Sequence, residues 1–317
     1  MNRYMVTKPG VWTGRISGQQ LYLHEKVKCI NLEKENKDKK KAIAFLGYAC
    51  DVGIKRNQGR IGAGKGPDAI RNALGKLPNH LEKNVDFLDV GTLECQDGKL
   101  ENIQTHLSEK VALLLEKGTF PIVIGGGHDI AYGHYNGIKK YVGPNTSIGI
   151  INFDAHFDLR SDSNGGNSGT PFYQIAQDCK IDTSTFNYLC LGIRWDANDR
   201  TLFETATKLG VDYIENKDFT MQNTSIVFRK LQDFITNVDH IYVTIDLDGF
   251  SSAYAPGVSA PSPIGFSPNI VLKSLESILN SKKLISIDIA EMNPKYDIDN
   301  HTAKLAASLV HYIMHAI

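Results

Sequence analysis

The amino-acid sequence predicts a three-layer α/β/α fold, in which helices cover both faces of an open, mostly parallel sheet of about eight strands. Short apolar runs alternate along the chain with segments whose apolar residues recur at helical spacing. The runs are apolar throughout rather than at every second position, which is typical of parallel strands buried on both faces. Acidic and histidine residues follow several of these runs, at the strand ends where open α/β sheets bind ligands.

The strands and helices follow one another without an internal repeat. The first expected strand, residues 42–49, reads AIAFLGYA. Seven further apolar runs predict strands over residues 86–90, 120–124, 148–153, 187–193, 211–214, 240–245 and 283–289. Helices are expected after His128 and over residues 66–77, 101–117, 171–177, 200–209, 225–234, 269–279 and 302–316. The long loop over residues 50–65 is rich in Gly, Asn and Arg, and loops of this kind at strand ends often carry function.

The first forty-one residues do not fit this alternation. They contain Trp12 and end in a run of charges over residues 33–41, which is typical of a solvated linker. We therefore expect an N-terminal arm and charged linker over residues 1–41, followed by a single α/β domain over residues 42–317.

Composition excludes several classes of partner. Lys plus Arg equals Asp plus Glu at 35 each, so the chain has no electrostatic footprint for nucleic acid or an anionic membrane. No apolar run reaches the ~18 residues that a membrane span needs, and residues 1–10 lack a signal-peptide core. Five cysteines without a CxxC motif indicate free thiols in a reducing compartment. These features predict a cytoplasmic protein.

The segment over residues 151–160, INFDAHFDLR, contains the strongest chemical signal. Asp154, His156 and Asp158 occupy every second position after an apolar run. Alternate residues of a strand point to one face, so the three side chains should converge at the end of a buried strand. A carboxylate or imidazole there needs a positive partner, because an unpaired buried charge costs several kcal/mol.

Two other strand ends carry the same kinds of side chain. Asp246 and Asp248 again stand two residues apart after an apolar run, and the turn GGGHD presents His128. The set of four carboxylates and two imidazoles, without thiolate, suits Mn²⁺, Mg²⁺ or Zn²⁺. Two divalent cations balance four carboxylates, whereas one would leave two charges unpaired in a poorly solvated cleft. The sequence therefore predicts a dinuclear hydrolase that activates a water between two ions.

Four motifs in order resemble those of the ureohydrolases, the arginase and agmatinase superfamily of dimanganese amidinohydrolases. The motifs are GGGHD (125–129), DAHFDLR (154–160), TIDLDGF (244–250) and DIAEMNP (288–294). The resemblance implies an arginase-like fold and two Mn²⁺ per subunit, and it is compatible with a homo-oligomer. It also implies that Asp154 and Asp246 bridge the ions. His128 with Asp158 would then complete the ligands of one ion, and His156 with Asp248 those of the other. The resemblance further implies that Glu291 accepts hydrogen bonds from the substrate's amidine or guanidine nitrogen.

Further stretches resemble the formimidoylglutamase subfamily, which hydrolyses N-formimidoyl-L-glutamate to L-glutamate and formamide in histidine degradation. They are WTGR (12–15), RNQGRIGAGKGPDAIR (56–71), SGTPF (168–172) and SSAYAPGVSAPSPIGF (251–266). The implied partner is thus a small anionic amidine. Agmatinase, arginase or another guanidino-acid ureohydrolase is the alternative, and a catalytically idle metal-binding regulator is a second one.

The loop before Gly-Thr-Pro departs from the broader superfamily. Arginases and agmatinases place a histidine where this chain has Ser168, and a serine cannot act as a near-neutral acid. Asp158 is then our candidate for protonating the leaving amine.

Arginines in the loops favour an anionic substrate tail, because a planar guanidinium grips carboxylates in a bidentate manner. The candidate substrate-binding residues are Arg160 and Arg194, followed by Asn57, Arg60 and Asn198. We expect Asp129 to orient an imidazole, and we expect the remaining histidines, His134 among them, to be surface or helix residues without a ligand role.

Overall fold

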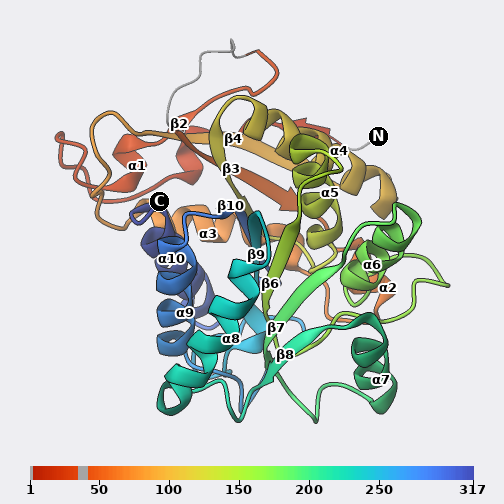
Figure 1. The fold of residues 1–317 in the computed structure, drawn as a ribbon. Helices are drawn as coiled ribbons and strands as arrows, with labels where there is room; N and C mark the ends of the chain where they lie inside the picture. The colour runs from red at the N-terminus through yellow and green to blue at the C-terminus, as the bar shows by residue number, and fades with distance from the viewer. Residues whose placement is uncertain (1–2, 35–41) are drawn as a thin grey trace.

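The computed structural model describes residues 3–34 and 42–317 (Figure 1). Residues 35–41 of the expected charged linker lie outside the described part of the chain. The strands that the structure describes form one sheet in the order β1-β4-β3-β5-β10-β9-β6-β7-β8, with β2 beside β4. Their bounds are β1 Arg3–Met5, β2 Lys28–Cys29, β3 Ala42–Ala49, β4 Asp86–Glu94, β5 Thr119–Ile124, β6 Ile148–Phe153, β7 Asn187–Ile193, β8 Asp212–Glu215, β9 His240–Asp246 and β10 Leu284–Ala290.

Helices cover both faces of this sheet (Figure 1). Their bounds are α1 Leu23–Lys26, α2 Val52–Arg56, α3 Gly66–Gly75, α4 Leu100–Glu116, α5 Ile130–Val142, α6 Pro171–Ile181, α7 Arg200–Leu209, α8 Thr224–Thr236, α9 Pro268–Asn280 and α10 His301–Met314. Alternate residues of each central strand feed two separate cores. Ile43 and Phe45 of β3 lie in the core shared with α3, α8, α9 and α10, whereas Ala44 and Leu46 lie in the core shared with α4, α5, α6 and α7. The three-layer fold predicted from the apolar runs is confirmed.

The sheet has more strands than the eight expected. The additional ones, β1 and β2, come from the N-terminal segment, and both pair with β4. β1 is antiparallel to β4, while β3, β5, β10, β9, β6, β7 and β8 are parallel to their neighbours. These two strands are too short to produce a distinct apolar run, which is why the sequence did not indicate them.

A buried ion pair ties the N-terminal segment to the rest of the fold. Arg71 of α3 donates through Nε and Nη2 to the Asp89 carboxylate, at 2.8 and 3.1 Å, and neither side chain is exposed. Asp89 also accepts from Trp12 Nε1 at 2.7 Å and from Thr7 Oγ1 at 2.9 Å. The backbone N–H of Gly91 also donates to Asp89 Oδ1, at 2.9 Å. Five hydrogen bonds to one carboxylate compensate its burial. The N-terminal residues 3–34 therefore pack onto the α/β core rather than extending from it.

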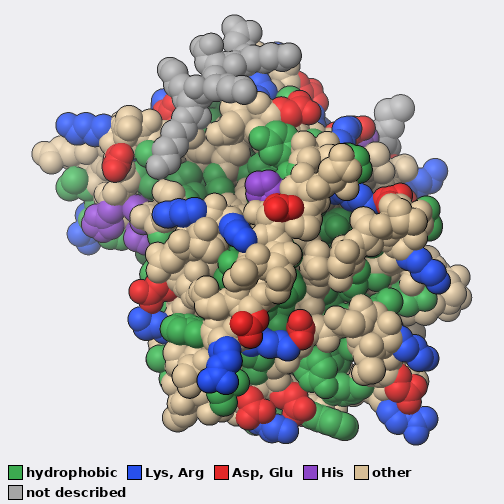
Figure 2. Space-filling model, in the orientation of Figure 1, with side chains coloured by type: hydrophobic (Ala, Val, Ile, Leu, Met, Phe, Trp, Pro, Cys, Tyr) green, Lys and Arg blue, Asp and Glu red, His purple; other side chains and the backbone are tan. Residues whose placement is uncertain are grey.

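The face of the molecule drawn in Figure 2 carries acidic and basic side chains interspersed with one another. Among the described residues, no helix is both long enough and apolar enough to cross a membrane.

Candidate metal centre and substrate cavity

The predicted ligands lie at the carboxyl ends of neighbouring strands in the middle of the sheet. The strands stand in the order β5-β10-β9-β6, although the chain visits them as β5, β6, β9 and β10. Phe153 of β6 pairs with Ile245 of β9, so Asp154 and Asp246 follow at the same level. Glycines at φ +88° and +74°, Gly125 and Gly126, turn the chain after β5, and His128 follows that turn. Parallel pairing thus brings together residues that lie far apart along the chain.

Ligands that stand two residues apart are brought together by tight turns where the strands end, and not by the alternation of side chains along a strand. β6 ends at Phe153, and Asp154 Oδ1 then accepts from the backbone N–H of His156 at 2.7 Å. Asp246 Oδ1 accepts from the N–H of Asp248 in the same way, at 2.8 Å. This short side-chain turn is a common local device of aspartate. The expectation that Asp154, His156 and Asp158 would share a strand face was therefore wrong in its cause, although the three side chains do converge.

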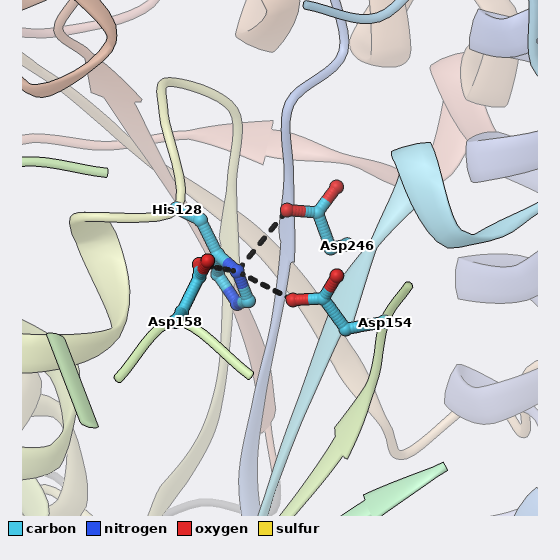
Figure 3. A group of neighbouring side chains, drawn as sticks. All are labelled: His128, Asp154, Asp158 and Asp246. Atoms are coloured by element: carbon cyan, nitrogen blue, oxygen red, sulfur yellow. Dashed lines mark ion pairs between the residues drawn. The ribbon is translucent and has the colours of Figure 1, made fainter. Parts of the chain in front are cut away.

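The first ligand cluster surrounds one nitrogen of His128 (Figure 3). His128 Nδ1 lies 2.8 Å from Asp158 Oδ2 and 3.1 Å from an oxygen of both Asp154 and Asp246. Figure 3 shows the four side chains pointing toward one another. Ligand atoms around an octahedral ion with bonds of ~2.1 Å are about 3.0 Å apart. The spacing of the cluster therefore fits a hard divalent cation.

The second ligand cluster shares Asp154 with the first and adds His156 and Asp248. His156 Nδ1 lies 3.3 Å from Asp154 Oδ1 and 3.3 Å from Asp248 Oδ1. The two oxygens of Asp154 thus face different clusters. Asp246 lies in the first cluster through Oδ2. A carboxylate that faces two ligand sets is suited to bridging two ions.

The buried carboxylates of this site repel one another, and a positive charge between them would relieve that repulsion. Burial, followed by repulsion from Asp154, raises the pKa of Asp158 to about 6. Burial and the neighbouring carboxylates likewise raise the pKa of Asp246 and hold that of Asp248 well above its usual value. Within the described part of the chain, His128 Nδ1 and Asp248 Oδ1 are buried without a hydrogen-bond partner. Both observations fit ion ligands, because a bound cation would neutralise the repulsion and satisfy these atoms.

Glu291 lies beside the first cluster in a constrained position. Its backbone has φ +67°, its N–H donates to Gly126 O at 2.9 Å, and its side chain is buried. Oε1 accepts from the backbone N–H of His128 at 3.0 Å, while Oε2 finds no partner among the described residues. Burial, then the charges of Asp246 and Asp248, holds the pKa of Glu291 well above its usual value. A cationic group at Oε2 would stabilise the ionised carboxylate.

A cavity of about 540 Å³ opens over these residues. Its walls include five of the six predicted ligands, namely His128, His156, Asp158, Asp246 and Asp248, and also Glu291, the residue predicted to bind the amidine. The other residues lining it are Asn57, Gln58, Gly59, Arg60, Arg160, Ser168, Asn198, Leu202, Ser259 and Ala260. Four of the five predicted substrate-binding residues are thus cavity residues. The fifth, Arg194, is engaged elsewhere, because its guanidinium pairs with Asp196 at 2.5 Å and donates to Ser262 at 2.7 Å.

The polar residues of the cavity differ in how far their hydrogen bonds are already used. Asn198 Nδ2 donates to the carbonyls of Ala155 and Arg194, both at 2.8 Å. These backbone contacts already use the donors of its amide. Arg60 donates to two carbonyls, those of Val258 and Ser259, and stacks on a tyrosine ring. Arg160 is half exposed, and its closest acidic neighbour in the described chain is Asp199 at 3.9 Å. Arg160 therefore has the most capacity to bind an incoming anion.

Ser168, which stands in place of the superfamily's histidine, accepts from Asn57 Nδ2 at 3.1 Å. Its side chain is largely buried at the cavity wall. The residue lines the same cavity as five of the predicted ligands and offers a hydroxyl there.

One expectation about a supporting residue was wrong. Asp129 does not orient an imidazole: its Oδ2 accepts from Tyr48 OH at 2.7 Å, while burial raises its pKa to about 7. His134 is a helix residue, as expected, but it is fully buried in α5, and both of its ring nitrogens have polar neighbours. Those neighbours, Ser286 and Asp288, occupy alternate positions within the otherwise apolar strand β10. Two polar residues at alternate positions of an apolar strand indicate a buried polar partner on that face. Our expectation for His134 did not take this signal into account.

Comparison with known proteins assigns the chain to a family. The family model for the arginase family matches residues 41–316. The chain belongs to the arginase family. It is 42% identical to a formimidoylglutamase of Clostridium tetani, over 96% of this chain and 94% of that protein, and 40% identical to one of Geobacillus thermodenitrificans, over 96% and 95%. The similarity to these relatives thus extends over nearly the whole length of the chain.

Solved arginase-family structures have the same fold. A formimidoylglutamase from Bacillus subtilis superposes with a TM-score of 0.82 at 20% identity, covering 96% of this chain and 94% of that one. A Trypanosoma cruzi formiminoglutamase solved with two Mn²⁺ gives a TM-score of 0.76 at 25% identity, covering 90% of this chain and 98% of that one. The predicted arginase-like fold is thus confirmed.

Proposed function

We propose that the chain is a formimidoylglutamase that uses two Mn²⁺ ions to hydrolyse N-formimidoyl-L-glutamate to L-glutamate and formamide. The observation that carries this proposal is the pair of ligand clusters sharing Asp154 at the floor of a cavity whose wall holds Arg160. The relatives named formimidoylglutamase, and the Mn²⁺ in the T. cruzi protein, support the substrate and the metal.

The ligand clusters would hold the two ions, with Asp154 and Asp246 shared between them. Bound ions of this kind lower the pKa of a water between them and stabilise negative charge that develops on the substrate. The six side chains come from three different strand ends, and the buried ones cannot move far without losing their packing. The protein's part in this chemistry is therefore to fix the ligand positions before the substrate arrives.

Glu291 would orient the amidine. The residue lines the cavity, its Oε2 has no partner among the described residues, and a protonated formimidoyl nitrogen is the donor that would satisfy it. The carboxylate is held by the N–H of His128, so the amidine carbon would be fixed relative to the first cluster. Addition of water to that carbon gives a tetrahedral species, from which the bond to the glutamate nitrogen must break.

Asp158 would carry the proton to the departing amine. It lines the cavity, its backbone is held at φ +49°, and its side chain is 12% exposed. Water supplies the proton, Asp158 passes it to the glutamate nitrogen, and the C–N bond breaks to release L-glutamate and formamide. A carboxylate in this position removes the need for a histidine at Ser168.

The carboxylates of the glutamate tail would bind near Arg160, with Asn57 and Arg60 as secondary contacts. Arg160 is placed by its own backbone N–H, which donates to Gly169 O at 2.9 Å, and its guanidinium has only a distant acidic neighbour among the residues described. Its charge is thus largely unused in the protein alone. An anionic tail fits this site better than the cationic tail of agmatine.

The five cysteines have no disulfide partner among the described residues. Free thiols are typical of proteins in reducing compartments, which supports our proposal of a cytoplasmic location.

The experiment is steady-state hydrolysis by the Mn²⁺-loaded protein, offered N-formimidoyl-L-glutamate, agmatine, arginine and guanidinobutyrate in parallel. We expect turnover of formimidoylglutamate alone, and loss of that turnover together with Mn²⁺ content in an Asp246→Asn variant. Urea release from a guanidino substrate, with formimidoylglutamate untouched, would contradict the substrate assignment and leave the metal centre standing.

A further inference from the structure

A chain of buried polar side chains lies behind the first ligand cluster, between α5 and strands β9 and β10. His134 of α5 is fully buried, with Nδ1 2.7 Å from Asp288 Oδ2 and Nε2 2.7 Å from Ser286 Oγ. Asp288 is paired in register with Thr244, and Thr244 Oγ1 lies 2.9 Å from His128 Nε2. The chain therefore connects His134 to a predicted ion ligand without touching the cavity.

The direction of the hydrogen bonds in this chain follows from Asp288. Its carboxylate accepts from Tyr242 OH through Oδ2 and from Thr244 Oγ1 through Oδ1, the latter at 2.5 Å. Because a carboxylate accepts hydrogen bonds, His134 Nδ1 donates to Asp288 Oδ2. Ser286 Oγ donates to the carbonyl of Pro121 at 2.9 Å and lies 2.7 Å from His134 Nε2. Three donors thus hold the Asp288 carboxylate in place.

This pairing determines which hydrogen His128 carries. Thr244 has already given its hydrogen to Asp288, so its oxygen accepts from His128 Nε2. With the hydrogen on Nε2, the lone pair of His128 is on Nδ1, which faces the three carboxylates of the first cluster. A metal ligand needs this arrangement, because a ring nitrogen that carries a hydrogen cannot coordinate an ion.

We propose that His134 is a positioning residue, which donates to Asp288 and fixes it as the acceptor of the Thr244 hydroxyl. Thr244 thereby holds His128 in the Nε2–H tautomer, with Nδ1 aimed at the first cluster. Without His134, the Asp288 carboxylate would keep only its two hydroxyl donors and could turn away from Thr244. The Thr244 hydroxyl would then be free to turn toward His128 and to donate to its Nε2. The proposal rests on the proposed function only in assuming that an ion binds the first cluster.

The test compares His134→Phe with Ser286→Ala in the full-length protein. Both changes remove one side of the same buried network, but only His134→Phe removes the partner of Asp288. For His134→Phe we expect the affinity of the metal-free protein for Mn²⁺, measured by titration calorimetry, to fall by roughly 10- to 100-fold. For Ser286→Ala we expect it to stay within about twofold. In ¹⁵N NMR of histidine-labelled, metal-free protein, recorded at a pH above the raised pKa of His128, the His128 signals should change from the Nε2–H tautomer to a mixture only in His134→Phe.

A second pair of variants keeps the test decisive if His134→Phe does not fold. Thr244→Val removes the hydroxyl at nearly constant volume and should lower Mn²⁺ affinity to a similar extent, whereas Thr244→Ser should restore it. Wild-type Mn²⁺ affinity and an unchanged His128 tautomer in folded His134→Phe, or in Thr244→Val, would overturn the proposal. Neither readout involves substrate, so an error in the substrate assignment would appear in the hydrolysis assay and not here.

Discussion

The backbone N–H of His128 donates to the Glu291 carboxylate at 3.0 Å, which joins a predicted ion ligand to the predicted amidine-binding residue. Both lie at the ends of adjacent strands, β5 and β10, and Glu291 is held in the left-handed region at φ +67°. Such a conformation costs about 1–3 kcal/mol outside glycine and persists only where the surrounding structure imposes it. In the proposed function, this contact would set the distance between the first ion and the substrate's reacting carbon before either has bound.

Replacing Glu291 by Gln should impair catalysis without removing the metal. The amide keeps an acceptor for the His128 N–H but loses the negative charge that faces the amidine. A hydrogen bond to a charged group contributes about 1.5–3 kcal/mol, so we expect kcat/KM for formimidoylglutamate to fall by about 10- to 100-fold. Steady-state kinetics and metal analysis of the same preparation check this. Loss of Mn²⁺ in parallel with activity would instead indicate a role in holding the ligands.

Arg160→Gln should raise KM for formimidoylglutamate more than it lowers kcat. The loss of one charge-assisted carboxylate contact predicts a change in KM of about 10- to 100-fold. Arg200→Gln is the matched control, because Arg200 is an exposed arginine of α7 whose side chain is 88% accessible and pairs with Glu204. Equal effects of the two substitutions would exclude a specific contact between Arg160 and the substrate's tail.

Metal binding should stabilise the protein more at pH 7.5 than at pH 5. In metal-free protein the folded-state pKa of Asp158 is raised to about 6, and those of His128 and His156 are also raised, because the neighbouring carboxylates outweigh the opposing effect of burial on the two histidines. The folded state thus binds more protons than the unfolded state, through Asp158 between about pH 4 and 6 and through the two histidines above about pH 6.5. The metal-free protein therefore loses stability as pH rises through these windows.

Mn²⁺ competes with these protons, because its ligands must be deprotonated. Differential scanning fluorimetry with EDTA or with Mn²⁺, at pH 5.0, 6.0 and 7.5, should show a Tm difference that grows with pH. Ion at 100 times its Kd would add about 2.7 kcal/mol. A Tm difference that shrinks as pH rises would mean that these groups do not bind the ion.

Asp89→Asn should destabilise the whole fold. It would leave the buried Arg71 guanidinium with only the exposed Asp68 as a counter-charge and weaken the contact from Trp12 Nε1, so we expect a loss of about 3–5 kcal/mol in the free energy of unfolding. Asp86→Asn is the control, because Asp86 pairs with the largely exposed Lys28 at 2.6 Å and such pairs contribute about 0–1 kcal/mol. Urea denaturation measures both. Equal midpoints for the two variants would show that the buried pair does not hold the N-terminal segment.

The predictions that held are those that depend on local sequence. The apolar runs identified the strands of the α/β core, because a strand buried on both faces must be apolar along its whole length. The ligand residue types and their spacing placed six candidate ligands, and the structure gathers all six into the two clusters. The family resemblance, drawn from four motifs, is confirmed by the arginase-family match over residues 41–316.

The sequence by itself determined the layered fold, the identity of the candidate ligands and the sign of the charge expected between them, because each of these follows from residue type and near-neighbour spacing. Only the tertiary structure decided that His134 is a buried partner of Asp288, that Arg194 is held by Asp196 and that Arg160 keeps its charge available. These outcomes depend on which side chain meets which across parallel strands and distant loops. Sequence spacing does not encode such contacts, because strand order and loop closure are set by the packing of the whole chain.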